Sequence, residues 1–205
     1  MNHSANLFSV ITTALILLSS VNLQASANVS QQDITQEVEE IYAEDILREA
    51  AASGDIDTVK HCLALRNIDI NYAPKFYNTP LGSAVEHGQQ EIVELLLATP
   101  GIDINQPNAF GNPPLYIAAW KGHTAIVRRL LAEPGIDVNL PEACGETPLL
   151  AATMRGNTEA VKLLLAAPGV DIHRAANDGD TPLHRAIENG FTEIAELLKA
   201  AGAKR

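Results

Sequence analysis

The side chains that could act as nucleophiles, redox groups or metal ligands are few in this 205-residue chain, and they are scattered along it. Its two cysteines, Cys62 and Cys144, exclude both a disulfide-dense scaffold and a zinc site built from four cysteines. The sequence has no phosphate-binding glycine loop, dinucleotide fingerprint, paired-histidine zinc motif or nucleophile elbow. We therefore expect a protein that is not an enzyme, with no catalytic residue, no metal and no cofactor.

Composition and charge limit the classes of partner. The chain has 25 acidic against 14 basic residues, a formal net charge of -11 and a pI of about 4.9. Such a chain repels phosphate backbones, so nucleic acid is not expected as a partner. With 46% hydrophobic and 19% charged residues the composition is globular, and with only 4% aromatic residues the core must be aliphatic.

The first 27 residues are typical of a secretory signal peptide. They contain no Asp, Glu, Lys or Arg, carry an apolar run from Leu7 to Leu18, and end in the small-residue site Ala25-Ser26-Ala27. The run is shorter than the roughly 20 residues that span a bilayer. We expect cleavage after Ala27 and export, to the periplasm or out of the cell, with no membrane contact afterwards. An uncleaved N-terminal anchor is the alternative.

An acidic segment follows. Residues 28–45 include six acidic side chains and no basic one. We interpret 28–43 as a solvated acidic linker with some helix near its end. A docking arm for a basic partner is the alternative interpretation.

From about residue 44 the chain repeats with a period of 34 residues. Four sequence features recur at equivalent positions of successive repeats: a Pro-Leu pair, a single glycine, a Pro-Gly pair, and an Asp followed by Ile or Val. Their positions are Pro80, Pro114, Pro148 and Pro182; Gly54, Gly88, Gly122, Gly156 and Gly190; 100–101, 134–135 and 168–169; and Asp69, Asp103, Asp137 and Asp171.

Each unit predicts two helices and a turn. A Thr-Pro-Leu start, as at 79–81, favours a short first helix, because Thr can cap free N–H groups and Pro fits the first turn. That helix should end at the single glycine. Gly111, Gly145 and Gly179 suit the tip of a hairpin-like turn that needs positive φ. Apolar residues at helical spacing predict second helices over 91–98, 125–132, 159–166 and 193–200.

These units resemble ankyrin repeats, most clearly in TPLHRAIENGFTEIAELLKAAGA at 181–203 and in the segments 79–105 and 147–173. The resemblance implies an all-α repeat solenoid, an ankyrin-type stack of helix-turn-helix units joined by hairpin loops, that binds proteins. Tetratricopeptide repeats share the period, but their first helix is longer and they lack the hairpin loop. We expect five repeats, the outer two acting as caps, over about 44–75, 76–109, 110–143, 144–177 and 178–205.

The chain departs from the ankyrin pattern in three ways. Each repeat is one residue longer than usual, through the Pro-Gly pair. Pro113 stands where the capping Thr is expected. The His that usually follows Pro-Leu occurs only as His184.

The repeat register also places the reactive side chains. Cys62 occupies the position of Leu96 and should be buried, whereas Cys144 falls at a turn tip and should be exposed. Because the two lie more than two repeats apart, we expect no disulfide between them. Redox or other enzymatic activity at Cys144 stays open as an alternative.

Positions that vary while the skeleton repeats are candidates for partner recognition, at the turn tips and on the concave wall of first helices. Trp120, the only tryptophan, would lie near the centre of this wall beside Met154, with Glu86 and Glu188 on either side. An apolar centre with acidic ends suits a partner with an apolar knob inside a basic rim. The predicted partner-binding residues are Phe76, Asn78, Glu86, His87, Phe110, Asn112, Trp120, Lys121, Glu146, Met154 and Arg155.

The function that follows is an exported, non-catalytic module, expected to be a monomer, that binds another protein on its concave face and turn tips. An inhibitor, immunity or scaffolding role is one form of it, by analogy. The alternatives are the activity at Cys144 and a membrane-tethered structural spacer.

Overall fold

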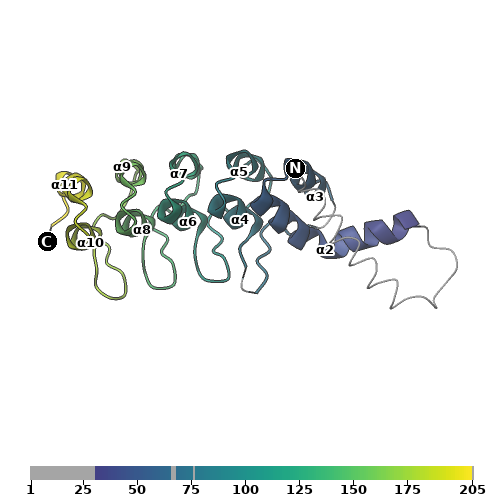
Figure 1. The fold of residues 1–205 in the computed structure, drawn as a ribbon, viewed down its shortest axis with the longest axis horizontal. Helices are drawn as coiled ribbons and strands as arrows, with labels where there is room; N and C mark the ends of the chain where they lie inside the picture. The colour runs from purple at the N-terminus through teal and green to yellow at the C-terminus, as the bar shows by residue number, and fades with distance from the viewer. Residues whose placement is uncertain (1–30, 66–67, 76, 205) are drawn as a thin grey trace.

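The computed structural model describes residues 31–65, 68–75 and 77–204, with side chains from Tyr42 onward. The expected signal peptide and Phe76 lie outside these residues. The described residues form ten helices and no strand, arranged as a row of five helix pairs (Figure 1). The helices are α2 (Gln31–Ser53), α3 (Ile56–Leu63), α4 (Pro80–Glu86), α5 (Gln90–Leu97), α6 (Pro114–Lys121), α7 (Thr124–Leu131), α8 (Pro148–Met154), α9 (Thr158–Leu165), α10 (Pro182–Glu188) and α11 (Thr192–Ala200).

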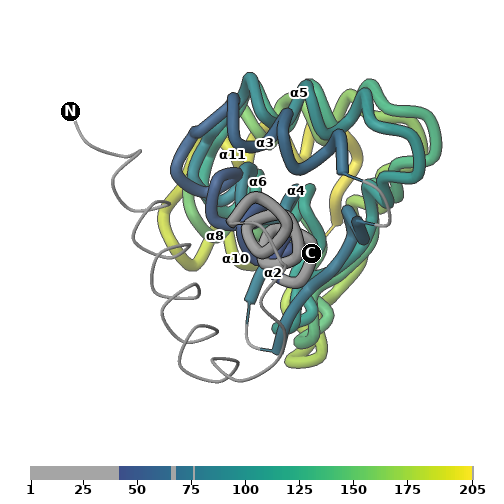
Figure 2. Tube along the Cα trace, turned by 90° about the vertical axis from the view of Figure 1, so that its right-hand side faces the viewer, coloured from purple at the N-terminus to yellow at the C-terminus, as the bar shows by residue number. Residues whose placement is uncertain are grey.

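The pairs stack in one direction. First helices contact first helices from α4 to α10, and second helices contact second helices from α3 to α11. The loops that join one pair to the next all project to the same side of the row, beyond the first helices (Figure 1). Viewed along the row, successive loops overlap (Figure 2). We call these loops fingers and identify each by its residues: 98–113, 132–147 and 166–181, with 64–79 as the first.

The start of each first helix matches the sequence-based expectation. The Thr79 and Thr147 hydroxyl oxygens accept the N–H of Gly82 and Leu150, at 2.9 and 3.2 Å, and Thr181 caps α10 in the same way. Pro113 has the same extended backbone at the start of α6 and makes no side-chain cap. The departure at Pro113 therefore removes one capping hydrogen bond and leaves the fold unchanged.

The acidic segment is helical over more of its length than the expected helix near its end. Residues 31–43 belong to α2, which continues without a break to Ser53 and packs against α3 and α4. Residues 31–53 contain no Gly or Pro and are rich in Glu, Gln and Ala, so nothing in their sequence ends a helix. The first repeat thus begins with a helix much longer than those of the inner repeats.

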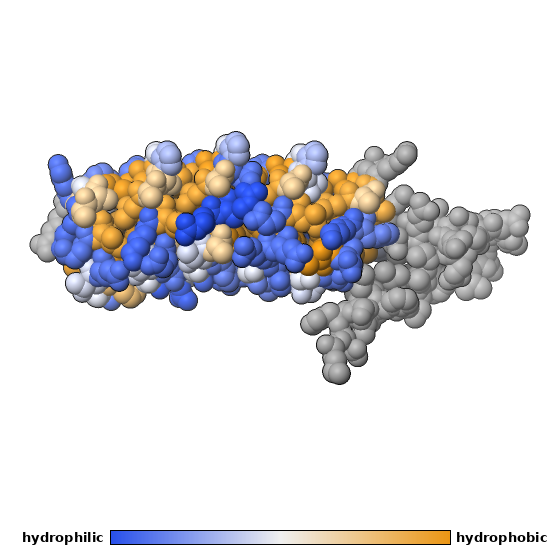
Figure 3. Space-filling model, turned by 90° about the horizontal axis from the view of Figure 1, so that it is seen from above, coloured by the Kyte–Doolittle hydropathy of each residue, from blue (hydrophilic) through white to orange (hydrophobic). Residues whose placement is uncertain are grey.

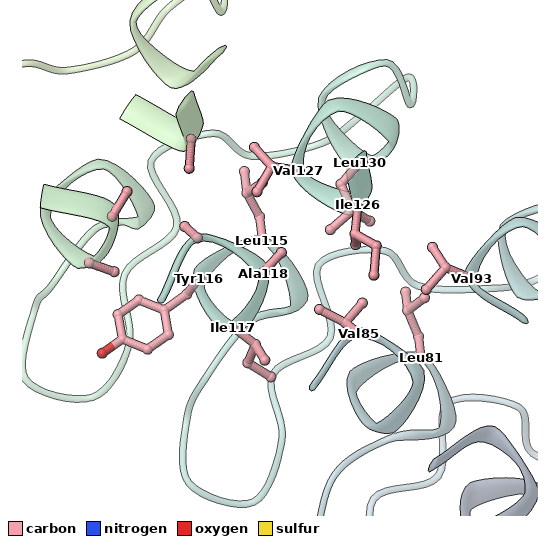
Figure 4. Packing of buried hydrophobic residues seen from close by; sticks show 14 of the residues in the cluster. Leu81, Val85, Val93, Leu115, Tyr116, Ile117, Ala118, Ile126, Val127 and Leu130 are labelled. Carbon is pink, nitrogen blue, oxygen red and sulfur yellow. The ribbon is translucent and has the colours of Figure 1, made fainter. Parts of the chain in front are cut away.

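The core is aliphatic, as the composition predicts. Leu115 and Ala118 of α6 face Ile126, Val127 and Leu130 of α7, and this arrangement recurs in each inner pair (Figure 4). Apolar side chains also show between the second helices on the face opposite the fingers, interrupted by charged ones (Figure 3). Several leucines of the second helices, among them Leu95, Leu131 and Leu163, are only partly buried and pack against the core.

Asparagines link each finger to the next. Asn105 Nδ2 donates to the Gly135 carbonyl at 2.8 Å, and its Oδ1 accepts the N–H of Asp137 at 2.9 Å. The Pro-Gly pair supplies that carbonyl, and Gly135 has a positive φ of 86° that favours glycine. The same pair of bonds recurs at Asn71 and Asn139. The Pro-Gly pair that lengthens each repeat and the Asn of the Ile-Asp-Ile-Asn motif thus form one contact between neighbouring fingers.

Replacing Asn105 with alanine should lower the free energy of unfolding by about 1 kcal/mol, because two inter-repeat hydrogen bonds at a solvated site are lost. Urea unfolding followed by circular dichroism measures this change. His173 occupies the same register position in the last described finger, 166–181, where no further finger follows among the described residues, so His173→Ala should leave stability nearly unchanged. Equal losses for both variants would contradict the role of the asparagines.

Candidate functional site

An open groove of about 560 Å³ lies on the finger side of the stack, between α4, α6 and two finger tips. The first helices form its floor, and the fingers 98–113 and 132–147 form its walls. It is lined by aromatic, amide and charged side chains: Asn78, Glu86, Asn108, Phe110, Asn112, Tyr116, Ile117, Trp120, Lys121, Glu142, Ala143 and Cys144.

Two aromatic side chains form a platform on the groove floor. Tyr116 and Trp120 lie one turn apart on α6 and stack with ring centroids 6.2 Å apart and planes 16° from parallel. Tyr116 is only 8% exposed and belongs to the buried core, and Figure 4 shows its ring pointing away from Leu115. Its hydroxyl donates to Glu146 Oε2 at 2.8 Å. Burial and this hydrogen bond raise the pKa of Tyr116 well above its ordinary value, so Tyr116 stays a protonated donor that holds the ring in place.

Trp120 is half-buried and packs against the core. The guanidinium of Arg155, from the next repeat, lies over its ring at 4.9 Å from the centroid. This is the geometry of a cation–π contact. Trp120 therefore has a structural role as well as a face in the groove.

A chain of hydrogen bonds fixes the opposite side of the groove. Lys121 pairs with Glu86 at 3.0 Å, Asn78 donates to the other oxygen of Glu86, and Asn108 donates to Asn78. Asn108 also accepts the backbone N–H of Phe110 and Asn112 at 2.9 Å, which closes the finger tip. Partial burial opposes ionisation of Glu86, but the bonds from Lys121 and Asn78 outweigh it and lower its pKa. Glu86 is thus a charged, fully engaged group.

The two finger tips carry Phe110 and Cys144. Phe110 is 56% exposed, which is unusual for so large an apolar side chain. Glu142 Oε1 accepts the N–H of Cys144 at 2.6 Å and that of Glu146 at 3.1 Å. The negative charge of Glu142, with desolvation and Glu146, raises the pKa of the Cys144 thiol. Less thiolate is present at neutral pH than in an ordinary cysteine, which disfavours a nucleophilic or redox role.

The two thiols should therefore differ in reactivity. Cys144 is exposed and Cys62 is buried at 2% exposure, so an alkylating reagent should label Cys144 alone in the native protein. Because the thiolate is the reactive form, the labelling rate should rise with pH to a midpoint above that of a free cysteine. Glu142→Gln should move this midpoint to lower pH. Mass spectrometry of the labelled chain over a pH series checks both results, and labelling of Cys62 at an equal rate would contradict the repeat register.

Only some of the predicted partner-binding residues line the groove. Those that line the groove are Asn78, Glu86, Phe110, Asn112, Trp120 and Lys121. Glu146 and Arg155 lie beside it, bonded to Tyr116 and stacked on Trp120. Met154 is half-buried and His87 is exposed with its ring against the Ser83 carbonyl, and neither lines the groove. Phe76 lies outside the described residues.

Sequence reasoning missed several lining residues, chiefly Asn108, Tyr116 and Glu142. Position 108 in one finger corresponds to 142 in the next and to Ala176 in the last, so its variation was visible in the alignment of the repeats. Tyr116 stands where the ankyrin pattern has His. Neither signal indicated that these side chains would meet in one groove.

The acidic ends expected for the wall are not free charges. Glu86 pairs with Lys121, and Glu188 pairs with Arg185 at 3.0 Å. The expectation of a basic rim on the partner loses part of its basis, since both carboxylates already have a cation.

The described residues hold no group of three or more His, Cys, Asp or Glu side chains that could bind a metal ion, and two histidine-register side chains instead contact neighbouring repeats. His123 contacts the Glu86 carbonyl through Nε2 at 3.2 Å and lies against Gly88 of the preceding repeat. Asn157 fills the equivalent place, where its amide donates to the Ala119 carbonyl at 2.8 Å. This register position links neighbouring repeats.

The comparison with family models agrees with the fold. A model described as ankyrin repeats (3 copies) matches residues 47–142 and 135–204. The chain therefore belongs to the ankyrin repeat family, whose members generally mediate protein–protein interaction and are typically not enzymes. A search of curated proteins finds no match. Within the described part of the chain no helix is long and apolar enough to cross a membrane.

Proposed function

We propose that this protein is an exported, non-catalytic binding module that holds a partner protein in the groove between α4, α6 and the tips of the fingers 98–113 and 132–147. The observation that carries the proposal is the exposed Phe110 beside the Tyr116–Trp120 platform. Aromatic side chains in a preformed hollow are the usual centres of binding energy in protein interfaces. The polar chain from Lys121 to Asn108 supports the groove in advance of binding, which reduces the entropy that a partner must overcome.

The finer form of the proposal is that the partner is an enzyme, which the stack inhibits, protects or holds in place. A small, acidic and rigid stack suits such a role. The redox alternative is disfavoured by the raised pKa of Cys144. The membrane-tethered spacer depends on residues 1–27 and is separated from export by the experiment below.

Capture from the native host tests the binding function. The purified protein is immobilised, exposed to host extract and secreted fractions, and retained proteins are identified by mass spectrometry. We expect one protein whose retention is competed by soluble chain and lost with Phe110→Ala. Because Phe110 is largely exposed, that variant should fold normally. The proposal would be refuted if no protein were specifically retained, or if groove variants retained the protein as well as the wild type does.

Export is tested by processing. Replacing Ala25 and Ala27 with bulky residues should leave unprocessed precursor in the native host, because the cleavage site needs small side chains. N-terminal sequencing of the wild-type protein should begin at Asn28. Full-length protein found soluble in the cytoplasm would rule out export, and full-length protein in the membrane would favour the spacer.

A further inference from the structure

The groove is electrically asymmetric. On the side of α4, Glu86 is engaged by Lys121 and Asn78, so its charge is compensated. On the side of the finger 132–147, Glu142 and Glu146 have no basic partner among the described residues. Their charges raise the pKa of Cys144, and together with the larger effect of burial they raise the pKa of Tyr116. One wall of the groove is therefore negative and the other neutral.

Glu142 is a carboxylate whose position is fixed by the finger tip. Its Oε1 accepts the two N–H groups that close the finger tip. Glu142 also lines the groove, where its carboxylate lies beside the Cys144 thiol. A carboxylate oriented by backbone N–H groups needs no rearrangement to accept a charged donor.

The aromatic floor beside this carboxylate already accommodates one cation of the chain itself. Arg155 lies over the Trp120 ring at 4.9 Å. A second aromatic face, that of Phe110, is exposed on the finger tip. Aromatic faces attract cations, and they also cover the apolar stem of a long basic side chain.

From these observations we propose that the groove receives one arginine or lysine side chain from an extended segment of the partner protein. The cationic head pairs with Glu142, and the stem and an adjacent apolar side chain lie against Phe110 and the Tyr116–Trp120 platform. The net charge of -11 adds a long-range attraction for such a segment. The inference rests on the proposed function and specifies the chemistry of the partner at this groove.

The single tryptophan makes the test direct, because Trp120 lines the groove and its fluorescence reports occupancy. The probes are three capped twelve-residue Gly/Ser peptides with a central Leu-Arg-Leu, Leu-Gln-Leu or Leu-Glu-Leu. We expect the arginine peptide to bind the full protein about tenfold more tightly than the glutamine peptide, and the glutamate peptide to bind most weakly. Added salt should reduce the difference.

A matched pair of variants tests whether Glu142 is responsible for the preference for the arginine peptide. Glu142→Gln removes the charge but keeps an oxygen that can accept the two finger-tip N–H groups. This variant should bind the arginine peptide about tenfold more weakly than the wild-type protein does, and its affinity for the glutamine peptide should be unchanged. Glu196→Gln makes the same charge change on α11, outside the groove, and should alter the affinity for neither peptide. Circular dichroism checks that both variants are folded.

Several outcomes would overturn the inference: equal affinity for the three peptides, no fluorescence change with any of them, or equal losses in the two variants. These outcomes are separable from failure of the proposed function. If host extract yields a partner whose retention requires Phe110 while the peptides do not discriminate, the binding function stands and the basic segment is wrong. If no partner is retained but the arginine peptide binds through Glu142, the proposed function fails and the local chemistry stands.

Discussion

The Trp120→Ala variant should lose partner binding by about 2 kcal/mol or more, which is a roughly thirtyfold or larger increase in Kd. The ring supplies part of the groove floor and carries the contacts of Tyr116 and Arg155. Because Trp120 is half-buried and packs on the core, its loss should also lower the free energy of unfolding by about 1–2 kcal/mol. Retention of the captured partner and urea unfolding measure the two effects on the same sample.

Two further variants separate binding from folding. Trp120→Phe keeps an aromatic face and should recover part of both losses. Ile187→Ala removes an apolar side chain that is 41% exposed on α10, outside the groove, and should leave binding intact. A large loss of stability in Trp120→Ala with unchanged binding would show that the ring serves only to join repeats, and would move the site to the finger tips.

The largest loss of stability is expected for Leu130→Ala. Leu130 lies on α7 in the middle repeat, is 0% exposed, and fills the space between α6 and α7. Removing its three side-chain carbons beyond Cβ should cost about 3–4 kcal/mol, from lost burial and the cavity that remains. Since each repeat contacts only its neighbours, a weakened centre should also make urea unfolding broader, as the two halves become less coupled. Circular dichroism through the transition measures both the midpoint and the slope.

The adjacent Leu131 is the control for this substitution. It is on the same helix and has the same side chain, but it is only partly buried. Leu131→Ala should cost less than half as much and leave the transition sharp. Similar losses at both positions would mean that helix propensity or a general effect of substitution on α7, rather than the cavity, determines the result.

Features that depend on neighbours along the chain were predictable. Thr147 caps α8 because the hydroxyl of a residue at that position reaches the N–H of Leu150 three residues on. The 34-residue spacing of Pro-Leu and of the apolar residues located the helices from α4 to α11 within one or two residues and placed Cys62 in the core and Cys144 at a tip. Candidate positions at the finger tips and first helices were also identifiable, as Phe110 and Trp120 illustrate.

The tertiary structure was needed to identify the side-chain contacts between neighbouring repeats. Lys121 and Glu86 are 35 residues apart, and Tyr116 and Glu146 are 30 apart, so neither pair follows from the pattern within a repeat. These pairings depend on how far one repeat is displaced and rotated against the next, and on which rotamer each long side chain adopts. The sequence therefore determined the stack and its exposed positions. Only the packing of repeats determined which charges are paired between repeats and which side chains meet in the groove.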